Sequence, residues 1–375
     1  MTTTKNNEHK KLNVPNLRFP EFQGEWEYFL INDVCSEFKS GKNIKADSVF
    51  ECGEYPVYGG NGLRGYASSY NHEGSYVLIG RQGALCGNVR SVYGKTYITE
   101  HAIAVAGNEK SNTNFLHYLF LKMNLGQYSD QSAQPGLAVN KLLKLKVALP
   151  IISEQTKIAK FLSLLDERIA TQNKIIEKMQ TLIKGIVDST ILRKEKNAIV
   201  GDVCSISEQI RAEANIDDII TVRLHGNGVC KSSAENLQLG ATQYYRRRAG
   251  QLIYGKQNFH NGAIGIVPIS LDNGITSKDI PSFDIDEMKC NSVYLLAQLQ
   301  SPQYYKPAEA LTTGTGSKRL KEETFLKMPI VLPNKREQDN IATLIISISA
   351  NLDQAKKMLD LFSIQKQYLL RQMFI

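Results

Sequence analysis

Side chains that can hydrogen-bond the edges of nucleic-acid bases are concentrated in two parts of this chain. Arginine, lysine, asparagine and glutamine contact bases through paired hydrogen bonds, and aromatic rings stack on bases or contact the backbone. The first half of the chain supplies Tyr58, Asn61, Arg64, Arg81 and Gln82. The second half supplies Tyr245, Arg246, Arg247, Lys256, Asn258 and His260. These residues predict two surfaces that read a nucleic acid.

The two sets share one placement. Arg81 follows an Ile-Gly pair and Lys256 follows a Tyr-Gly pair, while the flanking sequence differs. A recurring basic residue in a changing context is what we expect of two surfaces that read different sequences. The predicted binding set is completed by residues on other polar segments, which are Gln134, Arg223, Thr315, Ser317, Lys318 and Arg319.

No catalytic residue and no metal ligand is predicted. Residues 60–65 (GNGLRG) have the spacing of a dinucleotide fingerprint, but the next residues, YASSYN, do not begin a helix. Residues 314–318 (GTGSK) lack the spacing of an ATP-binding phosphate loop. The six cysteines form no CxxC pair and the six histidines form no HExxH motif. No Pro-Pro pair is present for the motif of an adenine methyltransferase.

The composition favours a globular protein with an anionic partner. The 375 residues carry 45 Lys and Arg against 37 Asp and Glu, which gives a net charge of +8, and 42% of them are hydrophobic. There is no apolar run of about 18 residues, and residues 1–11 lack the apolar core of a secretory signal. We therefore expect a cytoplasmic protein with reduced cysteines and no membrane contact.

The chain contains an internal repeat. Leu-Pro at 149–150, Glu-Gln at 154–155 and Ile-Ala at 158–159 recur without a gap 183 residues later, at 332–333, 337–338 and 341–342. An apolar seam with alternating spacings of four and three residues follows each copy. Its main positions in the first copy are Ile158, Leu162, Leu165, Ile169, Ile176 and Ile183. In the second copy they are Ile341, Ile345, Ile348, Leu352, Leu359 and Leu369.

The repeat predicts the domain organisation. Each seam indicates a helix of about 38 residues, roughly 55 Å long, and the matched seams favour an antiparallel coiled coil within one chain. Lys366 interrupts the second seam where Ile183 stands in the first. We expect an α+β protein with a pseudo-twofold repeat, divided into a tail (1–12), a globule (13–150), a helix (151–192), a second globule (193–333) and a second helix (334–375).

The chain resembles the specificity subunits of type I restriction–modification systems. Residues 16–22 (NLRFPEF) with Trp26 resemble the usual opening of that family, and the doubled Leu-Pro, Glu-Gln and Ile-Ala pattern resembles its two spacer helices. The segments 58–62 (YGGNG) and 79–83 (IGRQG) look like parts of its target-recognition domains. The resemblance covers essentially the whole chain after residue 12.

The resemblance implies a division of labour. Each globule would be a target-recognition domain that reads one half of a split sequence in double-stranded DNA. The two helices would set the spacing and hold two methyltransferase subunits, which use S-adenosylmethionine to methylate adenine N6. Two restriction subunits would cleave DNA with ATP and Mg²⁺. The chain itself would bind no cofactor and catalyse no reaction.

Three alternatives stay open. The first is a stand-alone regulator that binds split DNA sites, which differs in recruiting no methyltransferase. The second is a fused nuclease that uses Asp284, Glu287 and Lys289, for which metal-dependent cleavage by the isolated chain is the test. The third is a coiled-coil scaffold without a DNA role, which would leave no two-part footprint on DNA.

Overall fold

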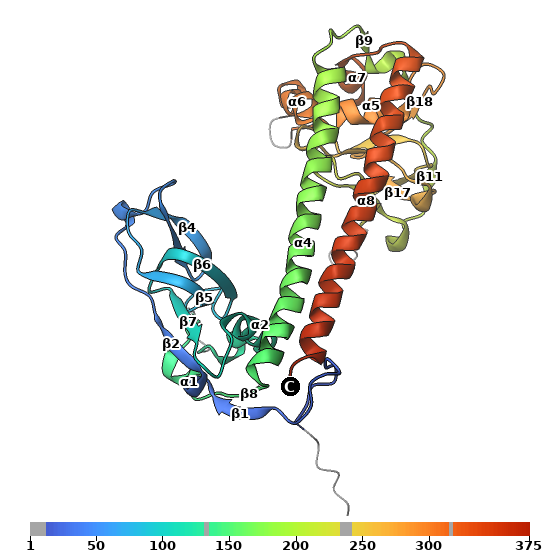
Figure 1. Cartoon of the computed structure of the whole chain (residues 1–375). Helices are drawn as coiled ribbons and strands as arrows, with labels where there is room; N and C mark the ends of the chain where they lie inside the picture. The colour runs from blue at the N-terminus through green and yellow to red at the C-terminus, as the bar shows by residue number, and fades with distance from the viewer. Residues whose placement is uncertain (1–12, 131–134, 233–241, 315–317) are drawn as a thin grey trace, which may run out of the picture. The chain divides into compact units, whose positions relative to one another are not determined.

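The computed structural model describes four stretches of the chain, residues 13–130, 135–232, 242–314 and 318–375. They divide into two compact units. Unit 1 comprises Met1–Gln172 and Met358–Ile375, and unit 2 comprises Asn173–Lys357. Two long helices, α4 (Ile152–Val187) and α8 (Lys335–Gln372), each contribute to both units (Figure 1). The expected α+β class with two long helices is confirmed.

A six-stranded sheet forms the centre of unit 1. Its strands are β2 (Cys35–Ser40), β3 (Tyr55–Gly59), β4 (Gly62–Ala67), β5 (His72–Gly80), β6 (Val89–Ile98) and β7 (Ala102–Gly107). Their order is β2-β7-β5-β6-β3-β4, with β3 and β6 parallel and the other neighbours antiparallel. The remaining elements are β1 (Glu27–Leu30), α1 (Ile31–Val34), η1 (Ala46–Ser48), α2 (Thr113–Met123), η2 (Leu125–Tyr128), α3 (Val139–Leu142) and β8 (Lys146–Leu149).

The core of unit 1 lies between this sheet and α2. Alternate residues of a strand point to opposite faces, so Val77 and Ile79 of β5 face the main core while Leu78 joins a smaller cluster on the other face. Phe115 and Leu119 of α2 are buried in the main core. Figure 1 shows α2 between the sheet and α4. The helix thus connects the sheet to the long helix of its own unit.

The first and last described segments of unit 1 meet in its core. The ring of Trp26 lies 6.0 Å from that of Phe115 and 6.4 Å from that of Phe374. Trp26 is 2% exposed and Phe374 is 3% exposed. The backbone N–H of Leu17 donates to the carbonyl of Gln372 at 2.9 Å. Burial of these aromatic rings, each worth roughly 1.5–3 kcal/mol, makes the end of α8 an integral part of unit 1.

Unit 2 is built from short strands. Its described strands are β9 (Ala198–Ile199), β10 (Cys204–Ile206), β11 (Arg211–Ala212), β12 (Ile220–Val222), β13 (Val229–Lys231), β14 (Tyr244–Arg246), β15 (Leu252–Tyr254), β16 (Ile264–Ile266), β17 (Ile275–Ser277), β18 (Ser282–Ile285) and β19 (Pro329–Ile330). They form sheets in the orders β10-β18-β15-β16, β11-β14-β17, β12-β13 and β19-β9. The helical elements are η3 (Asp188–Leu192), η4 (Val200–Asp202), η5 (Ile216–Asp218), η7 (Phe259–Asn261), η8 (Ile269–Leu271), α5 (Ser292–Leu299), α6 (Pro302–Tyr305), η9 (Lys306–Leu311) and α7 (Glu322–Leu326).

Aromatic packing stabilises unit 2 in place of a large sheet. The rings of Tyr254, Phe259, Phe283 and Phe325 are each less than 1% exposed, and their neighbouring centroids lie 4.7–5.7 Å apart. The hydroxyl of Tyr254 donates to the carbonyl of Leu320 at 3.1 Å. Because that hydroxyl has a partner, the whole side chain can be buried without an unsatisfied donor.

The two long helices pair antiparallel in each unit. In unit 1 the N-terminal part of α4 packs on the C-terminal part of α8, with Leu162 and Leu369 in one cluster. In unit 2 the C-terminal part of α4 packs on the N-terminal part of α8, with Val187 and Ile345 in one cluster. Figure 1 shows the two helices of each pair side by side. Every predicted seam position is buried or half-buried.

Lys366 is accommodated inside the protein. Its ammonium lies 2.5 Å from the carboxylate of Asp166 and 5.9 Å from the ring of Tyr118. The Tyr118 hydroxyl donates to the same carboxylate at 2.9 Å. The interruption of the seam is therefore compensated by an ion pair between the two helices of unit 1. In the described part of the chain no helix combines the length and the apolar character needed to cross a membrane.

Candidate nucleic-acid interface

A hairpin tip brings the predicted residues of unit 1 together. The tip joins β3 to β4, and Gly62 has φ of +101°, which favours glycine. A methyl group added at Gly60 would lie 2.7 Å from the carbonyl oxygen of His101 and 3.6 Å from the backbone nitrogen of Arg81. Only glycine fits such a close approach, so the tip packs directly on the segment after β5. Asn61 is exposed at this tip.

The backbone around Arg81 is fixed on both sides. Its N–H donates to the carbonyl of His101 at 2.9 Å, and its carbonyl accepts from the N–H of Leu137 at 2.9 Å. Gln82 forms a bridge with Gly136, and its Oε1 lies 3.2 Å from Nδ1 of His101. The side chain of Gln82 is exposed and that of Arg81 is half-buried. These hydrogen bonds hold both side chains at one end of the sheet.

Two residues of this site were not predicted from the sequence. Arg90 is exposed on β6, and its guanidinium carbon lies 3.1 Å from the position of a Cβ at Gly62. His101 is exposed and contacts Gln82. Arg90 pairs in register with Leu78 of β5, so a correct hairpin register would have revealed it. We call the assembled group, Asn61, Arg64, Arg81, Gln82, Arg90 and His101, the tip cluster.

The tip cluster is strongly basic. Arg64 is exposed, and a Cβ at Gly59 would lie 2.8 Å from its Cδ. Among the described residues, the arginines in ion pairs are Arg18 and Arg319. The three guanidinium groups of the tip cluster are therefore available to phosphates or base edges. Two further residues were predicted to bind nucleic acid in this unit. Tyr58 is half-buried against the small cluster around Leu78. Gln134 lies outside the described residues.

In unit 2 the burial of Arg247 removes it from the predicted binding set. Its side chain is fully buried and donates to Thr276 Oγ1 at 2.8 Å, Ser282 Oγ at 3.1 Å and the carbonyl of Ile280 at 3.1 Å. Burial lowers the pKa of Arg247 to about 10, against a smaller opposing effect of Tyr245. Arg247 is charged at neutral pH and ties β14 to the segments around β17 and β18. Its predicted contact with a nucleic acid is wrong.

Tyr245 is also buried, with 6% of its side chain exposed. Its hydroxyl donates to Gln243 at 3.0 Å, and its ring lies 5.7 Å from the guanidinium of Arg247. The prediction that Tyr245 contacts nucleic acid is therefore wrong for the same reason. Arg246, between them, points to the exposed side of β14. Alternation along a strand separates the three neighbours.

Three other predicted basic residues of unit 2 are held in ion pairs. Lys256 Nζ lies 2.6 Å from Glu322 Oε1, and its side chain is 15% exposed. Arg319 Nε lies 3.2 Å from Asp279 Oδ1. Lys318 Nζ lies 3.7 Å from Glu309. Lys256 thus shares the position of Arg81 in the sequence pattern but not its freedom to contact a ligand. Thr315 and Ser317, the remaining predictions on this loop, lie outside the described residues.

Two loops of unit 2 bring the last predicted residues together. The N–H of His225 donates to the carbonyl of Asn261 at 2.7 Å, which joins the loop after Arg223 to the loop that holds Asn258 and His260. Arg223 and Asn258 are exposed, and His260 is half-buried. Asn261 Nδ2 donates to Asn258 Oδ1 at 3.2 Å. Arg246 is exposed on β14, at a place that no contact joins to these loops in the described residues.

The acidic segment of unit 2 gives the nuclease alternative no support. Asp284 Oδ1 accepts from Gln251 at 2.9 Å, and Lys289 Nζ lies 3.3 Å from Asp286. Glu287 is exposed. Among the described residues no group of three or more His, Cys, Asp or Glu side chains is placed to hold a metal ion.

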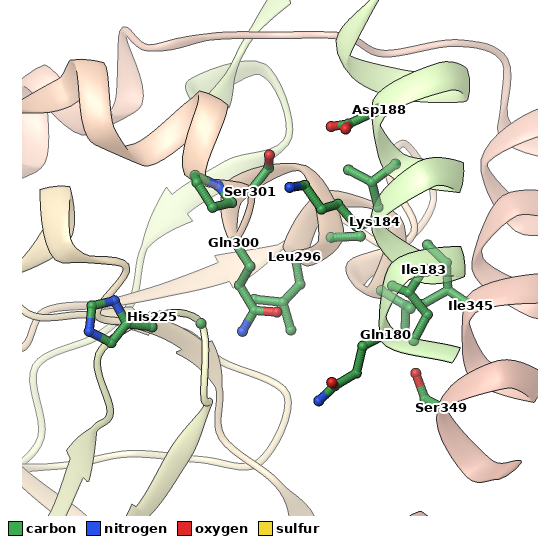
Figure 2. A pocket seen from close by; sticks show the side chains of 15 residues that line it. Gln180, Ile183, Lys184, Asp188, His225, Leu296, Gln300, Ser301, Ile345 and Ser349 are labelled. Carbon is green, nitrogen blue, oxygen red and sulfur yellow. The ribbon is translucent and has the colours of Figure 1, made fainter. Parts of the chain in front are cut away.

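A cavity of about 500 Å³ lies in unit 2 beside the helix seam. Ile183, Leu296 and Ile345 form its apolar wall, and Figure 2 shows Lys184 and His225 on opposite sides of it. The seam is therefore not closely packed at Ile183. The spacing of residues along α4 gives no indication of this cavity, because its other wall comes from α5 and from the loop at His225.

Comparisons with known proteins agree with this architecture. Residues 23–181 match the family described as type I restriction modification DNA specificity domain. The chain is 37% identical over 199 residues to the EcoprrI specificity subunit of Escherichia coli. The aligned region covers 52% of this chain and 47% of that protein. The chain thus spans about half the length of this curated relative. It is 23% identical over 386 residues to the MjaVIII specificity subunit of Methanocaldococcus jannaschii, covering 91% and 89% of the two proteins.

The fold is shared with a solved protein of the same kind. The crystal structure of the type I restriction-modification S subunit from M. genitalium superposes with a TM-score of 0.70 at 14% identity, over 96% of this chain and 99% of that one. The long helices and the mixed units thus have the fold of that S subunit. Residues 23–181 of this chain therefore carry a type I restriction–modification DNA specificity domain.

Proposed function

We propose that the chain reads a split DNA sequence, one half-site per unit, for a type I restriction–modification complex. The tip cluster carries this proposal. It places three arginines that form no ion pair with the described residues beside the exposed amide side chains of Asn61 and Gln82. Guanidinium and amide groups recognise base edges in the major groove, while the same charges attract phosphates. In unit 2, Arg223, Arg246, Asn258 and His260 would form the second reading surface.

The chain would position DNA for chemistry done by partners. An adenine inside a duplex must be turned out of the stack before its N6 is methylated, so the surrounding DNA has to be held in a fixed register. Two methyltransferase subunits with S-adenosylmethionine would carry out that step, and two restriction subunits with ATP and Mg²⁺ would cleave. This chain would supply recognition and attachment and no catalytic group.

The direct test is to map methylated adenines by single-molecule sequencing in cells with and without this chain, together with its methyltransferase. We expect one split motif that disappears when the chain is absent. A chain that binds the split motif yet recruits no methyltransferase in a pull-down would instead be a stand-alone regulator. If no methylation motif disappeared in cells without the chain, the proposal would be refuted.

The helices would set the spacing between half-sites. Inserting seven residues at matched levels of α4 and α8 keeps the seam in register and adds about 10 Å to each helix. We expect the unspecified spacer of the methylated motif to change by about three base pairs, since B-DNA rises about 3.4 Å per base pair. The bases read in each half should stay the same. An unchanged spacer in a folded, active variant would contradict this expectation.

A further inference from the structure

The repeated glutamine of each copy is buried in the same set of contacts. In unit 1, Gln155 is 0% exposed. Its Oε1 accepts from the backbone N–H of Asn112 at 2.8 Å. Its Nε2 donates to the carbonyls of Lys110 at 2.9 Å and Pro150 at 2.8 Å. One side chain thus joins the first turn of α4 to the loop before α2.

Unit 2 repeats this arrangement with different surroundings. Gln338 is 1% exposed, and its Oε1 accepts from the N–H of Asn291 at 2.9 Å. Its Nε2 donates to the carbonyls of Lys289 at 3.1 Å and Pro333 at 2.9 Å. The acceptor and both donors of each amide are used, so each glutamine is fully satisfied.

Both asparagines begin the helix that carries the core of their unit. Asn112 caps α2 by accepting from the N–H of Phe115 at 3.1 Å, and Asn291 caps α5 by accepting from the N–H of Val293 at 3.0 Å. Each asparagine also donates a side-chain hydrogen bond to the residue after the glutamine: Asn112 to Thr156 at 3.3 Å and Asn291 to Asp339 at 2.8 Å. We call each set of contacts a clamp.

Each clamp connects a long helix, which carries the sequence repeat, to a capped helix and the strands behind it, which differ between the units. The long helix provides the glutamine, and the capped helix packs against the strands that hold the predicted reading loops. Buried amides with complete hydrogen bonding permit one geometry, because any rotation leaves buried polar groups unpaired. The reading loops differ between units while the clamp does not. Its role therefore concerns orientation, independently of which bases are read.

We propose that Gln155 and Gln338 are positioning residues for DNA recognition. Each fixes the angle at which its unit holds its reading surface on its own long helix, and thereby restricts the complex to one spacer length. The spacer consequence rests on the proposed function above. The orientation itself can be tested without DNA.

The first experiment measures orientation within each unit of the full chain. Spin labels on non-canonical amino acids replace exposed Lys95 and Glu167 in unit 1, or exposed Lys278 and Lys178 in unit 2. In Gln155→Ala we expect the distance distribution of the unit 1 pair to broaden by about twofold, as for a locally released element, while the unit 2 pair is unchanged. Gln338→Ala should give the reverse pattern. Unchanged distributions in both variants would overturn the proposal.

The second experiment uses the complex with its methyltransferase. Binding is measured to the wild-type split site, to sites with one base pair more or less in the spacer, and to a single half-site. We expect either clamp variant to reduce discrimination between spacers by about fivefold, the effect of roughly one net hydrogen bond. Single half-site affinity should change by less than about twofold. Retained spacer discrimination in a variant with a broadened distance distribution would refute the spacer role.

Controls separate orientation from stability and from the proposed function. Gln365→Ala makes the same chemical change at an exposed position of α8 and should alter neither readout. Thr156→Ala removes only the outermost contact of the unit 1 clamp and provides a milder variant if Gln155→Ala fails to fold. A purely structural glutamine would lower thermal stability alone. If the wild-type complex reads no split site, the proposed function fails, while the spin-label distances still decide the clamp.

Discussion

In unit 1 the predicted reading residues lie at one end of a six-stranded sheet with strands of up to ten residues. In unit 2 the described strands have four residues or fewer, and several corresponding basic residues are buried or held by carboxylates. Where each unit meets a long helix, Gln155 and Gln338 make the same contacts. The repeat therefore keeps the contacts with the long helix, while the predicted reading residues lie on strands of different length and differ in their ion pairs.

The largest expected effect compares the two glutamates of the repeat. Glu154 is 0% exposed and accepts from Arg18 Nε at 2.8 Å and Nη2 at 2.7 Å, whereas Glu337 meets Lys194 at an exposed position. Arg18→Ala leaves a buried carboxylate unpaired and should lower the unfolding free energy of unit 1 by about 3–5 kcal/mol. Lys194→Ala should cost less than about 1 kcal/mol.

The measurement for Arg18→Ala is urea unfolding followed by the fluorescence of Trp26, the single tryptophan, which lies in unit 1. Hydrogen-exchange mass spectrometry follows unit 2 in Lys194→Ala. Equal losses in the two variants would show that the two ion pairs play the same role.

The next largest loss of stability is expected from one of two neighbouring arginines at the end of β14. Arg247→Ala removes a fully buried side chain with several hydrogen bonds and should destabilise unit 2 by about 2–4 kcal/mol. Arg246→Ala, one residue away and exposed, should change stability by less than about 0.5 kcal/mol. Hydrogen exchange in unit 2 is the readout. A comparable loss in Arg246→Ala would contradict the assignment of Arg247 as the structural residue.

Arg81 and Lys256 allow the two units to be compared by their binding to DNA. If Arg81 contacts a base, Arg81→Ala should weaken binding to one half-site by roughly 10- to 100-fold, which corresponds to about 1–3 kcal/mol. Lys256→Ala should weaken the other half-site by only about threefold, because Glu322 already holds its ammonium. Binding of each half-site to the complex tests both variants. If both halves weakened together in either variant, the assignment of one half-site to each unit would be wrong.

The sequence was informative wherever a pattern repeats along one element. Spacings of four and three residues identified the seam, and its positions from Ile158 to Leu369 are buried or half-buried as predicted. The same spacing could not show the cavity at Ile183, which depends on residues from another helix. Likewise, the sequence marked Gln155 and Gln338 as repeated, but only the fold shows which carbonyls and amides they contact.

Predictions of the site failed where the outcome depends on distant residues. The run Tyr245–Arg247 looks uniformly exposed in sequence, yet Arg247 is buried by Thr276 and Ser282, which lie 29 and 35 residues further on. Arg90 was missed because its place beside Gly62 follows from strand register and the hairpin fold. Charge and residue type alone cannot distinguish a cation that reaches solvent from one that satisfies the interior.

The aromatic contact of Trp26 with Phe374 has a consequence for biosynthesis. Unit 2 is one continuous segment, Asn173–Lys357, whereas unit 1 needs residues from before and after it. Domains generally fold as units, and unit 2 can complete its core from residues that are contiguous in the chain. Unit 1 must wait for Leu369 and Phe374. The unit whose synthesis begins first therefore cannot complete its core until the end of α8 has been made.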